Sequence, residues 1–461
     1  MTEVFLLGFF VVLLLAGLKH PFVWVLLYLY IEIVSPSKVG TQILASIQMS
    51  LITFGAMVGG WLLFDKTKGK ARFGMRQALI VALLLYCYVT TGWADFPDSA
   101  AEKWGWVWKS LIFAAFLPLT LTSRLRIEGA IMFYVLSLSV IVINGGVKTF
   151  LGGGGYGRLR LLVDDNSGLY ESSIIACAAI TAIPLIWWVA IHGRVFAQDK
   201  LTKAFAIGYT FAAILIPIGT SARTGLVCLA VLGLMILVQM KNRVLYGALM
   251  AFALIVSVPF LPASFTERMG TIQNYESDQS ASSRLAVWEW TIGYAMDNPL
   301  GGGFTAYRSN SIEVDIVRED RGASSSVVTE KTVIDKARAY HSSYFEMLGE
   351  QGWPGLALFL LLHVLGLWHM RKLYKGWKER TSERDKWVSP LAMALQQSHI
   401  IYLVGALFVG IAFQPFIMLI IAFQAALWSY SKYLDKEAEP RESQARRRRS
   451  GAADKPSAAT A

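Results

Sequence analysis

Apolar runs of membrane-spanning length recur along almost the whole of this 461-residue chain. A bilayer core about 30 Å thick is crossed by roughly 20 apolar residues in a helix. The composition agrees with such a topology, because 55% of the residues are hydrophobic and the mean hydropathy is +0.47. We therefore predict an all-α polytopic membrane protein with 12 transmembrane helices, or 13 if both short N-terminal runs cross. The predicted spans lie near 3–19, 21–35, 43–64, 77–93, 105–122, 127–144, 172–191, 203–219, 224–240, 243–261, 354–370, 390–412 and 414–432.

The formal net charge of +11 is distributed in a way that argues against a nucleic-acid partner. Lysines and arginines gather in short segments that the span count places on one side of the membrane, as the positive-inside rule expects of the cytoplasm. The loop at 94–104, on the opposite side, instead holds three acids and one lysine. The basic segments are 66–76, 124–126, 194–203, 241–243, 371–386 and 446–449.

Three regions depart from the alternation of span and short turn. Residues 1–261 are predicted as transmembrane helices interrupted by a Gly-rich outer loop at 145–171. Residues 262–353 form one large outer loop, and 354–433 return to the membrane. Residues 434–461 are polar, basic and rich in Ala and Ser, which predicts a disordered cytoplasmic tail.

The large outer loop is predicted to contain two short helices. Residues 284–296 have helical length and many apolar side chains, and the Gly/Pro-rich stretch 298–303 ends them. Residues 310–339 are polar and are predicted as a loop. Residues 340–351 read as the second helix, which ends near the glycine and proline that follow.

Two arginines occupy the otherwise cation-poor outer side. Arg223 stands between two spans, and its small neighbours would let a bulky anion approach the guanidinium fork. Arg284 begins the predicted helix 284–296, where free backbone N–H groups also attract anions. The plainer interpretations are a snorkelling arginine for Arg223 and a solvated one for Arg284. An anion site is the functional interpretation.

The Gly-rich loop adds weaker candidates. Arg158 and Arg160 follow a run of glycines, and a Gly-rich backbone can form a nest of N–H groups around phosphate. Asn166 follows two aspartates and offers a group for sugar hydroxyls or a metal. A flexible turn between helices is the plainer interpretation, and the loop matches no nucleotide-binding pattern.

His341 is the best candidate for proton transfer. It lies in the outer segment just before the chain re-enters the membrane, and an unperturbed imidazole titrates at about pH 6.5. A lone histidine is nevertheless more often structural than catalytic. The outer side carries cations without a carboxylate cluster, and arginines can neutralise a departing diphosphate without a divalent metal. We therefore predict no metal and no other cofactor.

Four patches of the sequence resemble the membrane O-antigen ligase and polymerase superfamily. They are T-S-A-R at 220–223, S-R-L-A-V-W at 283–288, N-P-L-G-G-G-F at 298–304 and H-S-S-Y-F-E-M-L-G-E-Q-G-W-P-G at 341–355. Their order also matches, as does a long outer loop ahead of the last spans. Ser342, where the family usually has Asn, departs from the pattern, and so does Ala222. The N-terminal third is similar to the O-glycosylation ligases associated with exosortase systems.

The resemblance implies a GT-C-like glycosyltransferase of the bacterial inner membrane, with its active site facing the periplasm. Carried over by motif, His341 is the catalytic histidine, and Arg223 and Arg284 hold the diphosphate of an undecaprenyl diphosphate-linked glycan. The leading prediction is a metal-independent, inverting O-antigen ligase with lipid A–core as acceptor and membrane lipids as surroundings. Further candidate substrate-binding residues are Arg158, Arg160, Asn166 and Tyr344.

Three other functions stay open at this point. An O-antigen polymerase and a protein O-oligosaccharyltransferase use the same donor, and the sequence gives no handle on the acceptor. A transporter of lipid-linked glycan is the alternative from another class. Transporters place ionisable groups near the bilayer midplane. Lys109 is the main candidate for such a group, whereas the other cations lie outside the spans, which favours surface chemistry.

Overall fold

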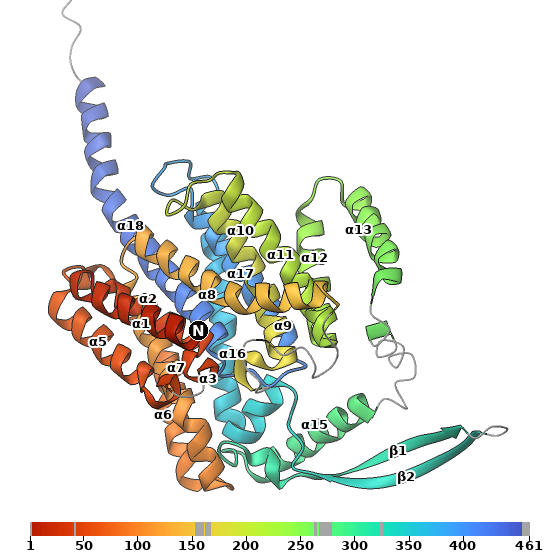
Figure 1. Ribbon diagram of the computed structural model, residues 1–461. Coiled ribbons are helices and arrows are strands. Elements are labelled where there is room, and N and C mark those ends of the chain that lie inside the picture. Colours follow the sequence, from red (N-terminus) through yellow and green to blue (C-terminus); the bar gives the residue numbers. More distant parts are fainter. Residues whose placement is uncertain are drawn as a thin grey trace, which may run out of the picture.

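The computed structural model is a bundle of helices with one two-stranded hairpin projecting from its edge (Figure 1). It describes residues 2–40, 43–152, 161, 167–261, 265–266, 279–321 and 326–453. The first helices are α1 (Thr2–Lys19), α2 (Phe22–Val34), α3 (Pro36–Val39), α4 (Ile43–Ser46), α5 (Met49–Phe64), α6 (Met75–Thr90), α7 (Pro97–Thr120) and α8 (Arg124–Phe150). Then come α9 (Ser172–Thr181), α10 (Ile183–His192), α11 (Lys200–Thr220), α12 (Arg223–Gln239) and α13 (Arg243–Ser257). The last elements are α15 (Gln279–Asp297), β1 (Ser311–Arg321), β2 (Ser326–Lys336), α16 (Ser343–Trp377), α17 (Val388–Gly405) and α18 (Pro415–Ala453).

Many of these helices have the length and apolarity of membrane spans. Each predicted span overlaps a helix, so the prediction of a mostly helical, multi-pass membrane protein is confirmed. The total of 12 or 13 crossings stays a prediction. Among the described residues, six helical segments are long and apolar enough to cross: Met75–Trp93, Arg124–Phe150, Ser172–His192, Lys200–Thr220, Ser343–Trp377 and Pro415–Glu437. Shorter apolar helices are Phe22–Val34, Met49–Phe64, Arg223–Gln239 and Arg243–Ala253.

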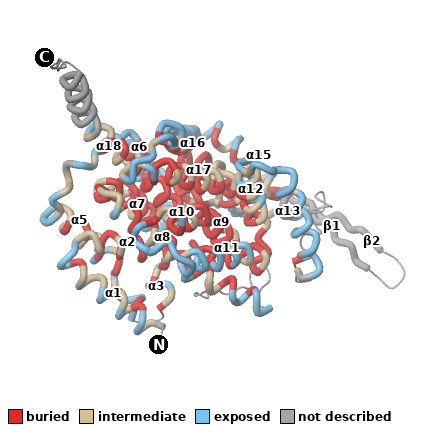
Figure 2. The backbone as a smooth tube through the Cα atoms, turned by 90° about the horizontal axis from the view of Figure 1, so that it is seen from above, coloured by how far each residue is buried: buried red, intermediate tan, exposed pale blue. Residues whose placement is uncertain are grey.

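The core of the bundle lies around α9, α10, α17 and the first half of α18 (Figure 2). Small residues let these helices approach closely, as is common between helices in membranes. Gly405 of α17 illustrates this, because a Cβ there would lie 2.5 Å from the sulfur of Cys177 on α9 and 3.1 Å from that of Cys228 on α12. The outer faces of α11 and α13 instead expose many large apolar side chains, as lipid-facing surfaces do.

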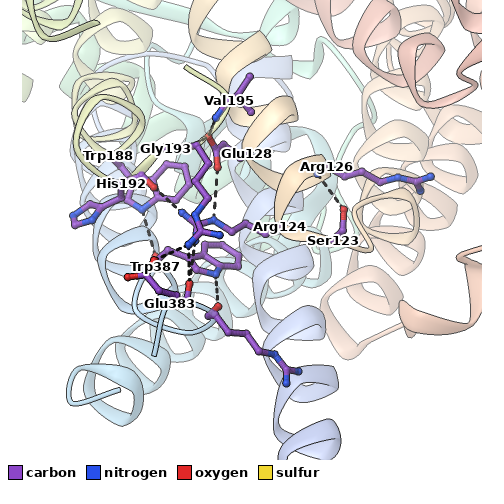
Figure 3. A network of polar contacts seen from close by, with 12 residues as sticks. Ser123, Arg124, Arg126, Glu128, Trp188, His192, Gly193, Val195, Glu383 and Trp387 are labelled. Atoms are coloured by element: carbon purple, nitrogen blue, oxygen red, sulfur yellow. Dashed lines mark hydrogen bonds and ion pairs between the residues drawn. The ribbon is translucent and has the colours of Figure 1, made fainter. Parts of the chain in front are cut away.

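Polar contacts gather the basic loops at one end of the bundle. Arg124, at the start of α8, donates to the carbonyl oxygen of His192 at 2.8 Å and to that of Glu383 at 3.4 Å (Figure 3). Its guanidinium also lies 5.1 Å from the ring centroid of Trp387 and 3.7 Å from the carboxylate of Glu128. Four of the predicted basic segments therefore share this end, and we call the opposite end the outer end. Further links there are Arg126–Asp65 at 2.6 Å, Arg194–Glu383 at 2.8 Å, Arg384–Glu437 at 2.6 Å and the Arg72 amide to Ser429 Oγ at 3.1 Å.

The stretch 310–339 differs from its prediction as a loop, because most of it forms the hairpin of β1 and β2. The strands are antiparallel, with Ser311 opposite Lys336 and Arg321 opposite Ser326. The prediction of a loop was wrong because it rested on the many charged residues of this stretch and gave too little weight to the β-branched ones. Valine, isoleucine and threonine recur along both strands and favour extended backbone.

The C-terminal tail also differs from its prediction. Residues 434–461 were expected to be disordered, but α18 stays helical to Ala453, and 454–461 lie outside the described residues. Alanine, glutamate, lysine and arginine dominate this stretch, and all four are good helix formers. High charge alone was therefore a poor criterion for disorder here.

Candidate functional site

His341 lies in a short linker between β2 and α16, at the outer end of the bundle (Figure 1). Trp288 of α15 fixes the linker on both sides of this histidine. Its Nε1 donates to the carbonyl oxygen of Tyr340 at 2.9 Å, and its ring stacks on Phe345 with centroids 4.8 Å apart and an interplanar angle of 8°. One side chain of α15 thus positions the residues before and after His341.

The base of the hairpin fixes the same linker from its other end. The Asn310 side chain donates to the carbonyl oxygen of Arg338 at 2.7 Å and accepts from its amide at 2.9 Å. The carbonyl oxygen of Asn310 accepts from the amide of Ala337 at 3.0 Å. Ala337 and His341 both adopt left-handed backbone, with φ of 57° and 47°, which is unfavourable for residues other than glycine. The hydrogen bonds to Asn310 help to offset this conformational cost. Such conformations cluster at functional sites.

The surroundings of His341 keep its ring uncharged. Loss of hydration lowers the pKa of this imidazole most, the guanidinium groups of Arg284 and Arg338 add to the effect, and together they bring the pKa of His341 to about 4. The ring still has surface open to solvent. Because this pKa lies far below 7, the imidazole is neutral at physiological pH and can accept a proton or a hydrogen bond.

Arg284 lies close enough to His341 for its charge to act on the imidazole, but it does not begin a helix as predicted. The helix begins at Gln279 rather than at Arg284, so this arginine lies in the second turn and not beside the free N–H groups of a helix start. The predicted helix did not include residues 279–283, although the glutamine and alanine found there are tolerated well in helices. The guanidinium of Arg284 is half-buried and near the imidazole, and the anion site stays a prediction.

Arg338 is the second arginine whose charge acts on His341, and it was not among the residues predicted from the sequence. It is half-buried and its guanidinium forms an ion pair with Asp335. Arg338 belongs to no recognisable motif, and it lies in the polar stretch 310–339 that was predicted as a loop. Its place depends on the bonds that Asn310 makes to its backbone.

Arg223 is the first residue of α12, at the outer end. Ser221, with φ of 50°, ends α11, and Ala222 is extended, so the chain reverses just before this arginine. Cys228 contacts the carbonyl oxygen of Ile401 on α17 at 3.8 Å. Arg223 precedes Cys228 by five positions, which is roughly 7.5 Å along the helix axis toward the outer end.

Tyr344 packs against the same stretch of α17. Its hydroxyl donates to the carbonyl oxygen of Leu403 at 2.9 Å, so it joins α16 to α17. The first turns of α12 and α16 therefore rest on neighbouring residues of α17, and Arg223 and His341 belong to one end of the molecule. The remaining predicted candidates, Arg158, Arg160 and Asn166, lie outside the described residues.

Two of the glycine-containing patches contact each other through their backbones. The amide of Gly302 donates to the carbonyl oxygen of Gly349 at 3.1 Å, and that of Trp353 donates to Pro299 at 3.0 Å. Gly352 interrupts α16 with φ of 62° and ψ of −167°, a conformation that essentially only glycine adopts. The patches N-P-L-G-G-G-F and H-S-S-Y-F-E-M-L-G-E-Q-G-W-P-G thus form one rigid junction under the first turns of α16.

A buried ion cluster supports that junction from the other side. Lys103 of α7 lies 2.6 Å from the carboxylate of Glu346 and 2.8 Å from that of Glu350. Glu350 also accepts from the amide of Thr305 at 2.9 Å, and Glu346 accepts from that of Ala412 at 3.2 Å. Glu346 is therefore turned toward Lys103 and is not available to orient His341. This cluster was not predicted. The sequence offers two signals for it, the spacing of Glu346 and Glu350 by one helical turn and the single lysine of an acidic loop.

A second polar network is buried inside the bundle, away from His341. Arg76 of α6 donates to Gln424 of α18 at 2.9 Å, and Gln424 contacts His399 of α17 at 3.1 Å. His399 in turn lies 2.6 Å from His363 of α16. These contacts form a chain across four helices, although Nη2 of Arg76 and Nε2 of His363 are buried without a hydrogen-bond partner. Among the described residues, no group of three or more His, Cys, Asp or Glu side chains is placed to hold a metal ion.

Two family models match this chain. Residues 208–360 match the O-antigen ligase family, and residues 1–194 match a family of unknown function (DUF5935). No curated protein matches the chain. The first region contains Arg223, Arg284, Arg338 and His341, together with both glycine-containing patches of the junction.

Proposed function

Because residues 208–360 match the O-antigen ligase family, we propose that this chain transfers a glycan from undecaprenyl diphosphate to lipid A–core. The proposal places this reaction at the periplasmic face of a bacterial inner membrane. The observation that carries it is the uncharged imidazole of His341 beside the guanidinium groups of Arg284 and Arg338. A proton acceptor next to an anion site is what transfer from a diphosphate donor requires.

In the proposed reaction an acceptor hydroxyl attacks the anomeric carbon of the donor sugar. The bond between that carbon and the diphosphate oxygen breaks, and its electron pair stays on the leaving diphosphate. The proton of the hydroxyl passes to a ring nitrogen of His341, which is neutral and free to take it. A single displacement of this kind inverts the anomeric configuration.

The arginines have a separate task in the proposed reaction. The leaving diphosphate gains negative charge, and a guanidinium fork matches two of its oxygens at once. Arg284 and Arg338 stand beside His341, and Arg223 lies at the same end of the bundle. We assign all three to diphosphate binding. No metal is required in this scheme because guanidinium groups supply the positive charge.

Substitution of His341 tests the catalytic assignment. We expect His341→Ala to lower transfer by at least about 100-fold, the usual contribution of a general base. The assay measures glycan transfer by purified protein from lipid-linked donor to acceptor, with a thermal unfolding scan alongside. His20→Ala is the matched control, because His20 is an exposed histidine at the basic end. Normal transfer by the His341 variant would refute the assignment of His341 as the catalytic proton acceptor.

The Arg284→Lys substitution tests the diphosphate role separately. A lysine keeps the charge but loses the planar fork, so we expect weaker donor binding and slower transfer. Binding is measured with the lipid-linked donor alone, and unchanged donor affinity in both Arg284→Lys and Arg284→Ala would count against the role.

The acceptor is tested in a strain that lacks the gene. Loss of O-antigen bands on a lipopolysaccharide gel, with long lipid-linked polymer accumulating, identifies a ligase. A single repeat unit still attached to lipid A–core identifies a polymerase instead. An unchanged gel directs the search to protein acceptors, as expected of an O-oligosaccharyltransferase.

A further inference from the structure

A cavity of about 990 Å³ opens at the outer end of the bundle, apart from His341. Its walls come from the end of α2, from α3, from the starts of α5, α7 and α18, and from residues 167–170 after the Gly-rich loop. This volume is at the upper end of the range typical of ligand pockets. Apart from residues 414–416, its lining lies in the region that matches the family of unknown function, so the ligase match assigns it nothing.

The cavity is held open by contacts between segments far apart in the sequence. The hydroxyl of Tyr170 donates to the carbonyl oxygen of Val34 at 2.6 Å. Lys38 of α3 donates to the hydroxyl of Ser167 at 2.9 Å. On the neighbouring wall, the amide of Leu44 donates to the carboxylate of Glu3 at 2.9 Å. Such bonds fix the rim, so the cavity is a built feature of the fold.

The charges in the cavity balance, unlike those around His341. Among the described residues that line it, the acids are Glu32 and Glu102 and the bases are Lys38 and Lys109. Lys109 lies close enough to Glu32 for its charge to act on that carboxylate. A diphosphate therefore gains no net attraction here, which separates this cavity from an anion site.

The remaining lining suits a ligand that carries hydroxyl groups on a partly apolar frame. Trp106 and Trp108 supply flat ring faces, and Trp106 keeps 38% of its surface exposed. Uncharged groups that both donate and accept hydrogen bonds surround these rings. Sugar rings combine hydroxyl edges with apolar C–H faces in this way. The uncharged polar residues of the lining include Ser35, Ser37, Gln48, Ser50, Ser167 and Gln414.

We propose that this cavity is a carbohydrate-binding site that holds part of a glycan chain at a distance from the reacting sugar. It shares a wall with the candidate site, because Glu102 is adjacent to Lys103 and Gln414 is two positions from Ala412. Both Lys103 and Ala412 contact Glu346 of α16. Only the source of the glycan, donor or acceptor, rests on the proposed function.

Substitutions at the open side of the cavity test the proposal. Trp106→Ala removes an exposed ring without disturbing the core, Trp106→Phe keeps an aromatic face, and Glu102→Gln removes one exposed acceptor charge. The control is Glu379→Gln, an exposed glutamate near the basic end. The probes are delipidated oligosaccharides, one released from the lipid-linked donor and one from lipid A–core. Their binding to the full-length purified protein is measured by saturation-transfer NMR and calorimetry.

We expect Trp106→Ala to weaken binding of one oligosaccharide at least tenfold and Trp106→Phe to restore most of it. In the transfer assay, KM for the corresponding substrate should rise by the same factor while kcat stays unchanged. An effect on the donor-derived or on the acceptor-derived oligosaccharide supports the site and identifies its source. Wild-type affinity of both Trp106 variants for both oligosaccharides would overturn it. Because binding is measured without turnover, a wild-type protein that binds glycan but transfers none would refute the proposed function alone.

Discussion

Gly352 offers the sharpest test of how the site is supported. A substitution to alanine places a methyl group on backbone with φ of 62° and ψ of −167°, and that methyl would lie 2.5 Å from the amide nitrogen of Gly301. It would also meet the carbonyl oxygen of Pro299, well inside van der Waals contact. Both neighbours are backbone atoms of the junction, so no side chain can swing away to make room.

The expected loss of unfolding free energy in Gly352→Ala has two separate contributions. A non-glycine residue in this region of φ and ψ costs about 1–3 kcal/mol. Forcing one extra carbon into a tight contact typically costs about another 1–3 kcal/mol. We therefore expect Gly352→Ala to destabilise the protein by about 2–6 kcal/mol, a large share of a typical stability of about 5–15 kcal/mol.

Gly376→Ala is the matched control in the same helix. Gly376 is exposed and helical, and a Cβ there meets nothing within 4 Å. We expect this variant to be about 0.5–1 kcal/mol more stable than wild type, because alanine loses less backbone entropy in a helix. The assay is thermal unfolding of the detergent-purified protein. Equal midpoints for the two variants would refute the argument that Gly352 is strained.

Three further predictions concern the Lys103 ion cluster, the pKa of His341 and the effect of Arg338 on it. Lys103→Met leaves two buried carboxylates unpaired and should cost about 3–5 kcal/mol in unfolding experiments, whereas adding Glu346→Gln and Glu350→Gln should recover most of it. Failure of that rescue would mean that packing, not charge, explains the loss. Since the pKa of His341 is lowered to about 4, kcat/KM should stay constant from pH 8 to 5 and fall as the pH drops through about 4 and the ring protonates. A fall centred near pH 6.5 would contradict the lowered pKa of His341. Arg338→Ala removes one cation that lowers this pKa, so the acid limb should move to higher pH, and an unmoved limb would exclude Arg338 from the site.

The helical architecture was largely predictable because its cause is local in sequence. A run of apolar residues reports directly on a membrane span, and the predicted spans all overlap helices. The hairpin was missed because charge and β-branching pointed to different structures over residues 310–339. The helical extension of α18 was missed for a similar reason, since charged residues can be both solvated and helical.

The candidate site was only partly predictable, because some of its residues are marked by type and motif and others are placed by tertiary contacts alone. His341 and Arg284 could be selected by residue type and motif, and the structure brings them together. Arg338 could not, because its place depends on Asn310 closing the base of a hairpin that the sequence did not reveal. The pairing of Lys103 with acids far along the chain is likewise a tertiary contact that spacing alone cannot show.

The two regions with separate family matches depend on each other at the candidate site. Trp93 donates to the carbonyl oxygen of Gly301 at 3.0 Å, and the amide of Asp95 donates to Gly302 at 2.8 Å. With Lys103, these residues come from the region of unknown function, whereas the glycines and His341 belong to the ligase region. A histidine on a linker needs such fixed support, since sites on loops are less precise than sites on rigid elements. The α6–α7 turn therefore supports the junction beneath the linker that carries His341, and residues 208–360 alone would lack this support.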